Sequence, residues 1–429
     1  MFDQTAYDKM IEALFVRFPS VQKTGFGDAY KPGLENMSRF DEALGYPSRA
    51  FRTIHVAGTN GKGSVSNMLA SALSAKGLKV GLYTSPHLLD FRERMMVTGE
   101  GMITKEGVWD FLEKYEGICD EMDLSFFEIT TGMAFDWFRQ RKVDVAVVEV
   151  GLGGRLDSTN IITPELSVIT SIGLDHCAML GDTREAIAGE KAGIFKPGVP
   201  AVVGTWDEQT APVFEQVAAQ SHSPLAFADM VEPALWSRAD EILAAMDLQG
   251  PCQRENLRTA LVALESIGID TDETVQDAII HTARRMDFHG RWEMLSREPD
   301  VICDIGHNPP ALKVNFARLE QYLADGTYDE LIMVYGVMAD KDLDGIIPMM
   351  PAQASYIFVT PDTRRAMPAE QILQAVSKAR EGHLTLGGDV KSGVRIALSS
   401  AQEALSAGRK PLIYIGGSTF VVCEAITLF

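Results

Sequence analysis

The sequence has few cysteines and no paired arrangement of them. The five are odd in number and widely spaced, without a C-x-x-C pair: Cys119, Cys177, Cys252, Cys303 and Cys423. This pattern argues against a disulfide framework and favours a reducing compartment. Cys177 follows a histidine, but no further cysteine lies at ligand spacing, so we do not expect a zinc site there.

Long apolar runs and excess positive charge are also missing. No run is long enough to span a membrane, and the first ten residues lack the basic region and apolar core of a signal peptide, so we expect a cytoplasmic protein without membrane partners. The chain has 39 basic and 59 acidic residues, a net charge of -20. This balance argues against nucleic acid as a partner, and an anionic substrate must meet a local cationic pocket.

Length and composition indicate two domains. A chain of 429 residues exceeds the size at which one core usually keeps growing, and 46% hydrophobic residues can build two cores. No internal repeat, low-complexity tract or heptad run stands out.

The most informative segment is residues 54–64, IHVAGTNGKGS. Residues 53–56 predict a buried strand, and residues 64–76 predict a helix closed by a glycine. The glycines between them, Gly58, Gly61 and Gly63, let the backbone approach a polyphosphate and tolerate positive φ. We therefore expect a nucleotide phosphate at this loop.

Two polar side chains of the loop fit that reading. Lys62 adds a mobile positive charge, and the Ser64 hydroxyl can reach a phosphate or its Mg²⁺. The spacing is a variant of G-x-x-x-x-G-K-[ST], because only two residues separate Gly58 from Gly61 and a further glycine precedes the serine. The alternative, a glycine-rich surface turn with an incidental lysine, fits the strand-to-helix context less well.

A second signal lies at residues 143–160. Its unbroken apolar run predicts a central parallel strand, with Glu149 near the carboxyl end, where ligands gather in open α/β sheets. A buried carboxylate needs a partner, and beside a phosphate loop a cation is the best candidate. A strand-end glutamate exposed to water is the alternative.

A third apolar strand, within residues 166–173, leads to Asp175 and His176 and then to a helix within residues 183–195 that carries Lys191. A single histidine or lysine is more often a satisfied polar residue or a solvated one. Their common position near a strand end is what makes them candidates for the site.

After Gly290, which resembles a hinge, apolar strands and helical stretches alternate to the end of the chain. The sequence thus predicts an α/β protein. A three-layer phosphate-loop domain would span residues 1–290, and a smaller Rossmann-like α/β domain would span residues 296–429.

An ordered series of motifs carries a close resemblance to a known family. In chain order they are G-L-E-N-M, H-V-A-G-T-N-G-K-G-S, Y-T-S-P-H-L, F-R-E-R, V-E-V-G-L-G-G-R-L-D-S-T-N, D-H, G-E-K-A-G-I-F-K-P-G, H-G-R-W-E, D-I-G-H-N-P, G-V-M-A-D-K-D, T-P-D-T-R-R-A and G-G-S. The chain resembles folylpolyglutamate synthases and the bifunctional dihydrofolate synthase/folylpolyglutamate synthases of the ATP-dependent Mur ligase superfamily. Two departures are D-I-G-H-N-P in place of D-G-A-H-N-P, and His289 where proline or glutamine is common.

The resemblance implies formation of an amide between a pteroate or folate carboxylate and the α-amine of L-glutamate. ATP would phosphorylate the carboxylate to an acyl phosphate, which the amine then attacks. Phosphoryl transfer asks a protein mainly for positioning and charge neutralisation, so no covalent nucleophile is required.

The resemblance also implies roles for residues of the first domain. Gly58, Thr59, Asn60, Gly61, Lys62, Gly63 and Ser64 would hold the ATP phosphates. Ser85 and Glu149 would bind one Mg²⁺, and Glu149 and His176 a second. The family lysine matching Lys191 is carbamylated and supplies an anionic oxygen to the second ion, which requires a depressed lysine pKa.

The remaining implied residues concern the nucleotide, the glutamate and the pterin. Asn256, Arg291, Asp304 and His307 match positions at ATP, with Asp304 at the ribose hydroxyls; the second domain would close the ATP and glutamate cleft. Ser418 is assigned to the glutamate side. Phe126, Phe127 and Thr130 could contact the pterin, although aromatic residues at helical spacing are more often core.

Other interpretations stay open at this level. A cell-wall ligase would need a domain for a uridine nucleotide ahead of the loop, where only about fifty residues precede Gly58. A nucleotide-binding regulator has no evident need for Ser85, Glu149, His176 and Lys191 together. The acceptor and any bound K⁺ are not fixed by the residues, and one chain suffices for the two-domain cleft, so we expect a monomer.

Overall fold

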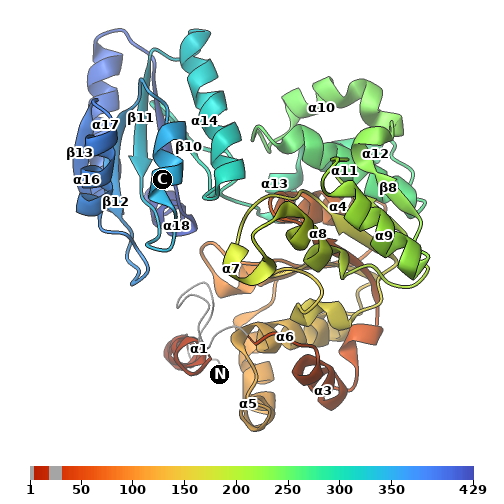
Figure 1. Cartoon of the computed structure of the whole chain (residues 1–429). Helices are drawn as coiled ribbons and strands as arrows, with labels where there is room; N and C mark the ends of the chain where they lie inside the picture. Colours follow the sequence, from red (N-terminus) through yellow and green to blue (C-terminus); the bar gives the residue numbers. More distant parts are fainter. Residues whose placement is uncertain (1–3, 19–30) are drawn as a thin grey trace. The chain divides into compact units, whose positions relative to one another are not determined.

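The computed structural model describes residues 4–18 and 31–429 (Figure 1). Its contacts divide the chain into two compact units, Met1–Asp247 with Gln253–Asp287, and Leu248–Cys252 with Phe288–Phe429. Each has its own sheet with flanking helices, which confirms the predicted α/β class. Residues 1–3, which belong to the segment expected to lack signal-peptide features, lie outside the described residues.

The first unit is built on an eight-stranded sheet in the order β4-β3-β2-β5-β1-β6-β7-β8. Its strands are β1 (Arg52–Ala57), β2 (Val80–Tyr83), β3 (Met95–Val97), β4 (Gly101–Met102), β5 (Val145–Glu149), β6 (Leu166–Ile169), β7 (Ala201–Val203) and β8 (Leu225–Phe227). The six adjacent strands β2-β5-β1-β6-β7-β8 are parallel to one another, and β3 pairs antiparallel with both of its neighbours. The predicted strand ending at Gly173 is shorter, because β6 ends where Thr170 and Ser171 turn to bond the phosphate loop.

The helices of the first unit are α1 (Gln4–Arg17), α3 (Glu35–Ala43), α4 (Lys62–Ala75), α5 (Lys105–Glu121), α6 (Phe126–Arg141), α7 (Cys177–Leu180), α8 (Arg184–Ala192), α9 (Ala211–Ser221), α10 (Ala239–Ala245), α11 (Gln253–Ser266), α12 (Glu273–Ile280) and α13 (Thr282–Met286). Short 3₁₀ turns lie at η2 (Pro47–Arg49), η3 (Phe91–Arg94), η4 (Ser158–Ile161), η5 (Ala228–Met230) and η6 (Ala234–Arg238).

Helices with buried apolar side chains cover the sheet of this unit. Helix α4 packs on β1, β2 and β5 and also contacts α11, α12 and α13. Helices α3, α5 and α6 bury their apolar side chains with Tyr83, Ala146 and Val148 of the sheet. Burying apolar side chains on both faces of a parallel sheet stabilises the strands whose carboxyl ends carry the site.

The second unit has the six-stranded sheet β13-β12-β11-β14-β10-β9. Its elements are β9 (Glu293–Arg297), β10 (Asp300–Cys303), α14 (Pro309–Ala324), β11 (Glu330–Tyr335), α15 (Leu343–Ile346), η7 (Ile347–Met349), β12 (Ser355–Thr360), α16 (Ala369–Ala379), β13 (Leu384–Asp389), α17 (Val390–Ser406), β14 (Pro411–Gly416) and α18 (Thr419–Ile426). Only β9 is antiparallel to its neighbour. Helices α14 and α16 share one core with the sheet, and α17 packs on β11 to β14 and on α18.

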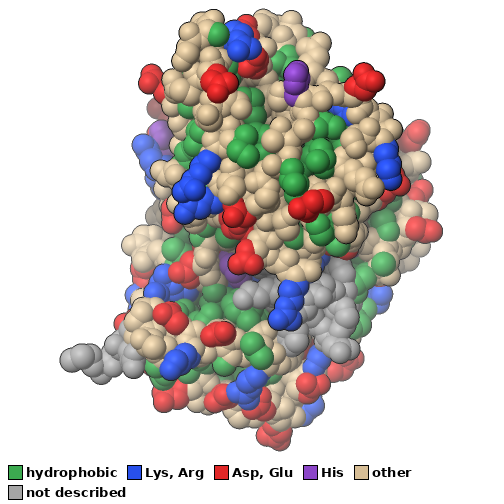
Figure 2. Space-filling model, turned by 90° about the vertical axis from the view of Figure 1, so that its left-hand side faces the viewer, with side chains coloured by type: hydrophobic (Ala, Val, Ile, Leu, Met, Phe, Trp, Pro, Cys, Tyr) green, Lys and Arg blue, Asp and Glu red, His purple; other side chains and the backbone are tan. Residues whose placement is uncertain are grey.

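On the face shown in Figure 2, acidic and basic side chains are interspersed. Among residues 4–18 and 31–429, no helix is long and apolar enough to cross a membrane.

Candidate active site

The phosphate loop follows β1 and opens α4. Gly58 has φ +149° and Gly61 has φ +86°, values that favour glycine. A Cβ at Gly58 would lie 1.9 Å from Thr170 Oγ1, and one at Gly61 would lie 2.3 Å from Asn256 Oδ1. Gly63 differs from expectation, because it lies in the first turn of α4 and has no positive φ.

Residues at the end of β6 fix the loop backbone. Thr59 N donates to Ser171 O at 2.8 Å, Asn60 N donates to Ser171 Oγ at 3.1 Å, and Thr170 Oγ1 donates to Asn60 O at 2.6 Å. In the described chain no side chain caps α4, whose N-cap is Gly61. The N-terminus of α4 therefore suits an anion, which backbone N–H groups and the helix dipole both favour.

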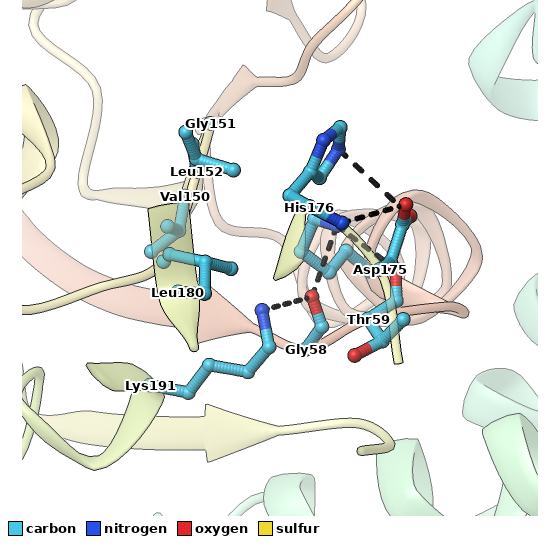
Figure 3. Close-up of a pocket in the computed structure, with 11 residues that line it drawn as sticks. Gly58, Thr59, Val150, Gly151, Leu152, Asp175, His176, Leu180 and Lys191 are labelled. Atoms are coloured by element: carbon cyan, nitrogen blue, oxygen red, sulfur yellow. Dashed lines mark hydrogen bonds and ion pairs between the residues drawn. The ribbon is translucent and has the colours of Figure 1, made fainter. Parts of the chain in front are cut away.

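Two lysines converge on this loop. Lys62 Nζ donates to Gly58 O at 3.1 Å and to Thr59 O at 3.2 Å. Lys191, in the last turn of α8, donates from Nζ to Gly58 O at 2.9 Å and is only 4% exposed (Figure 3). Burial, and then the nearby charge of Lys62, lower the pKa of Lys191 to about 7. A substantial fraction of this amine is therefore neutral near neutral pH.

A pocket surrounds the Lys191 amine. Its lining residues are Gly58, Thr59, Lys62, Val150, Gly151, Leu152, Gly153, Asp175, His176, Leu180 and Lys191 (Figure 3). His176 has φ +53° and is the N-cap residue of α7; its backbone N donates to Asp175 Oδ1 at 3.0 Å, and its Nε2 lies 3.8 Å from Asp175 Oδ2. The sequence prediction that Asp175, His176 and Lys191 gather near a strand end is confirmed by this pocket.

Glu149 ends β5 and is 3% exposed, which rules out the alternative of a solvated strand-end glutamate. Its Oε2 accepts a hydrogen bond from Ser85 N at 3.2 Å. Arg94 is also buried, and the Glu149 charge favours the protonated form of its guanidinium, although burial is the larger influence and lowers the Arg94 pKa. The structure thus brings Ser85 and Glu149 together.

Helix α11 adds two amides beside the loop. Asn256 is 6% exposed and donates from Nδ2 to Gln253 Oε1 at 3.0 Å, and Gln253 Nε2 donates to Ser64 Oγ at 3.4 Å. Together with the close approach of Asn256 to Gly61, these contacts put Asn256 and Ser64 in one cluster.

Three predicted residues of the second unit lie near β10. Arg291 Cζ lies 4.9 Å from the centre of the Phe288 ring. Asp304 directly follows β10, and His307 Nδ1 lies 3.0 Å from Ile305 O in the turn before α14. Ser418 is the N-cap of α18, accepting from Phe420 N and Val421 N at 3.1 and 3.3 Å, so helix capping alone accounts for a serine at this position.

The proposed pterin contacts divide into core and partly exposed residues. Phe126 is 3% exposed and stacks on Phe15 with 5.0 Å between ring centres, and Thr130 is fully buried with its hydroxyl 3.1 Å from Tyr83 OH. Phe127 is only partly buried, and a Cβ at Gly151 would lie 2.5 Å from its ring. Phe127 is therefore the member of this set best able to contact a ligand.

Several site residues were missed by sequence reasoning. Thr170 and Ser171 fix the loop, and Gln253 reaches Ser64. Asp157, 5% exposed, accepts from Leu152 N at 2.8 Å and so holds the segment that lines the pocket. The signal for the first pair was present, since polar residues directly follow an apolar strand.

These two units, with a phosphate loop in the first, define the architecture of a Mur ligase. Residues 56–249 match the Mur ligase middle domain, and residues 290–407 match the Mur ligase glutamate ligase domain. The chain is 35% identical over 360 residues to the dihydrofolate synthase/folylpolyglutamate synthase of Escherichia coli, covering 81% of this chain and 82% of that protein. The chain belongs to the folylpolyglutamate synthase and dihydrofolate synthase family.

Further comparisons extend over the whole chain. It is 33% identical to a probable bifunctional folylpolyglutamate synthase/dihydropteroate synthase of Haloferax volcanii, over 92% of this chain but only 48% of that protein, so it spans about half of that relative. The Mycobacterium tuberculosis folylpolyglutamate synthase solved with ADP and AMPPCP superposes with a TM-score of 0.83, at 29% identity and 99% coverage of both chains. The bifunctional Yersinia pestis enzyme with AMPPNP and Mn gives 0.80, at 28% identity and coverage of 98% and 97%.

Proposed function

We propose that this chain is an ATP-dependent ligase that joins L-glutamate to the carboxylate of a pteroate or folate. The acceptor carboxylate takes the γ-phosphoryl group of ATP and ADP leaves. The α-amine of glutamate then attacks the acyl carbon, releasing phosphate and a proton and forming the amide.

One observation carries the proposal, namely the buried Lys191 amine hydrogen-bonded to Gly58 of the phosphate loop. Burying a lysine amine is costly, so a function for this amine is the simplest explanation. We propose that the neutral nitrogen bonds the carbon of CO₂ and loses a proton, becoming a carbamate. A regulator that only senses nucleotide would not need such a group.

The donor set fits magnesium. Among residues 4–18 and 31–429, no three His, Cys, Asp or Glu side chains form a complete metal cage. Mg²⁺ usually keeps several waters and binds through one or two carboxylates together with phosphates. Glu149 and Ser85 would hold one ion, and Glu149, His176 and the modified Lys191 a second. When bound, Mg²⁺ neutralises charge on the transferring phosphoryl group.

The chain's own groups position the reactants. The α4 N-terminus and Lys62 would bind the phosphates, with Thr59 and Asn60 fixing the loop and Asn256 lying alongside. Asp157 would keep the Leu152 segment at the pocket wall. Phe127 would contact the pterin.

We further propose how the two parts divide this work. Residues 1–290 would carry the ATP and pterin sites. Residues 296–429 would contribute to nucleotide and glutamate binding, with Asp304 and His307 among the contacts. Arg291, which precedes this range, would also contribute. The enzyme would act as a single chain on small molecules. A location in the reducing cytoplasm would accord with the five free cysteines in the structure.

Phosphate release from ATP with L-glutamate tests the proposal. The acceptors are 7,8-dihydropteroate, tetrahydrofolate and a muramyl nucleotide, and each product is identified by mass. Turnover with dihydropteroate alone would define a dihydrofolate synthase, and turnover with both pterins a bifunctional enzyme. Release only with the muramyl nucleotide, or none at all, would overturn the folate assignment.

A further inference from the structure

The carboxylate of Asp304 is enclosed by donors from its own unit. Its Oδ2 accepts from Trp292 N at 3.0 Å, and its Oδ1 accepts from Gly306 N at 2.8 Å and from Asn315 Nδ2 at 2.6 Å. The side chain is 9% exposed. Two donors on Oδ1 and one on Oδ2 leave Oδ2 as the oxygen with capacity for another donor.

Asn315 is the one side-chain donor among these three contacts. It lies on α14, is 4% exposed, and its Nδ2 also lies 3.4 Å from Tyr414 OH. A polar residue on the buried face of a helix needs partners, and here the partner is a buried carboxylate. A hydrogen bond to an ionised acceptor is stronger than a neutral one, and among the three donors to this carboxylate Asn315 makes the shortest contact, at 2.6 Å.

Gly306 makes this arrangement sterically allowed. A Cβ at this position would lie 2.7 Å from Asp304 Oδ1 and 2.9 Å from Asn315 Nδ2. Gly306 has no positive φ, so its backbone would accept alanine and only the added methyl would intrude. It is also one of the two positions at which D-I-G-H-N-P departs from D-G-A-H-N-P. Gly306 and Asn315 therefore act on the same carboxylate oxygen.

The orientation of Asp304 governs two neighbouring segments. Its bond from Trp292 N holds the segment that carries Arg291, and its bond from Gly306 N holds the turn that carries His307. Ile305 N also donates to Gly290 O at 3.1 Å, which joins the same two segments. A change in the carboxylate orientation would alter the spacing of the groups proposed to meet ATP.

We propose that Asn315 is a positioning residue for nucleotide binding: by holding Asp304 Oδ1, it directs Oδ2 toward the ligand and keeps the Arg291 and His307 segments in register. This inference rests on the proposed function, because it presumes that Asp304 meets ATP. It adds to that function a residue outside the shared motifs, together with the reason for glycine at position 306.

The test compares Asn315→Leu, Gly306→Ala and the double variant with the wild type. Calorimetric titration with AMPPNP and Mg²⁺ gives the dissociation constant, and steady-state assays give KM for ATP and for glutamate. Phe316→Leu, on the same helix and 1% exposed, controls for loss of packing. Thermal unfolding shows that each variant is folded at the assay temperature.

Each single variant should weaken AMPPNP binding and raise the KM for ATP about tenfold, the order expected for losing a hydrogen bond to a charged group, with kcat and the glutamate KM nearly unchanged. The double variant should be no weaker than the worse single one, because both changes release the same oxygen. Phe316→Leu should lower the melting temperature without changing AMPPNP affinity.

Unchanged affinity in folded Asn315→Leu and Gly306→Ala would overturn the positioning role. Multiplying effects in the double variant, or an equal loss in Phe316→Leu, would overturn it as well, since each would indicate general loosening. A wild-type protein that does not bind AMPPNP would overturn the proposed function and this inference with it.

Discussion

At the scale of single residues, two buried bases have unusual titration. Lys191 donates to the phosphate loop with a pKa of about 7, and His55 of β1 is fully buried with a pKa lowered to about 3. In both cases burial is the main cause, because it disfavours the charged form. Lys191 gives a prediction about activity, and His55 gives a prediction about stability.

Lys191→Ala should reduce ligase turnover to background. The variant removes the amine that we propose to carry the carbamate, while the loop amides and Lys62 remain. AMPPNP titration should therefore still show binding within about tenfold of the wild type. Lys196→Ala, a nearby lysine whose Nζ donates to Asn160 O, is the matched control and should stay active. An active Lys191→Ala enzyme would contradict the two-metal proposal.

His55 should make the protein less stable in acid. Its unfolded-state pKa is about 6.5, so below that pH the unfolded chain binds a proton that the folded chain refuses until about pH 3. The free energy of unfolding should thus fall with falling pH by about 1.4 kcal/mol per unit in this window. The stability contribution is complete above pH 6.5 and is lost on the acid side.

Urea unfolding at pH values from 7.5 to 4 measures this slope. His55 Nε2 lies 2.8 Å from Thr159 Oγ1, and His55→Gln, which keeps a polar group there, should flatten the slope by about one proton. His222→Gln at an exposed position should leave it as in the wild type. Equal slopes in His55→Gln and the wild type would show that His55 is not the source.

At the scale of elements, Ser418 separates a structural role from a binding role. Its hydroxyl caps α18, and its side chain is 2% exposed. Ser418→Ala should cost about 1 kcal/mol of unfolding free energy through loss of the cap, whereas Ser418→Asp should retain the cap. If the residue only caps the helix, Ser418→Asp should keep the wild-type KM for glutamate. A large rise in that KM would instead favour the glutamate contact implied by the family resemblance.

The same scale shows how far sequence patterns predict the fold. Strong apolar runs such as residues 145–149 and 411–416 gave correct central strands, because burial on both faces leaves a continuous pattern. Strand β13 was missed because Leu384–Asp389 contains two glycines and is largely exposed, and helix α17, which directly follows it, was missed as well. The antiparallel strands β3, β4 and β9 were missed too, because they are short or lack a strong apolar run.

The site residues likewise divide into those marked by a local sequence motif and those that depend on contacts between distant segments. Local motifs predicted Gly58, Lys62, Glu149 and His176 as site residues, and the structure puts three of them in one pocket and Glu149 at the end of β5. Asn315 could not be found this way, because its partner Asp304 lies eleven residues earlier and the helix period alone marks position 315 as buried. Phe126 and Thr130 were candidate pterin contacts in the sequence, with a core position as the alternative for the aromatic residues, and both are buried in the structure.

At the scale of the whole molecule, net charge should influence substrate capture. A chain of net charge -20 repels anionic acceptors at long range, and salt screens that repulsion over about 10 Å at 0.1 M. Raising KCl from 20 to 200 mM should therefore increase kcat/KM for a folate with several glutamates by about twofold. Dihydropteroate, which carries a single carboxylate, should respond less. A fall in kcat/KM with salt would show that the local cationic pocket controls capture.

The edge strands of the two sheets affect how readily another chain could add a strand to them. The edges of the first sheet are β4 and β8, of two and three residues. In the second sheet, the pairing of β13 with β12 and of β9 with β10 shifts register along its length. Short or irregular edges offer another chain few aligned N–H and C=O groups. The described sheets are thus poor templates for strand addition, which protects the concentrated protein from assembling edge to edge.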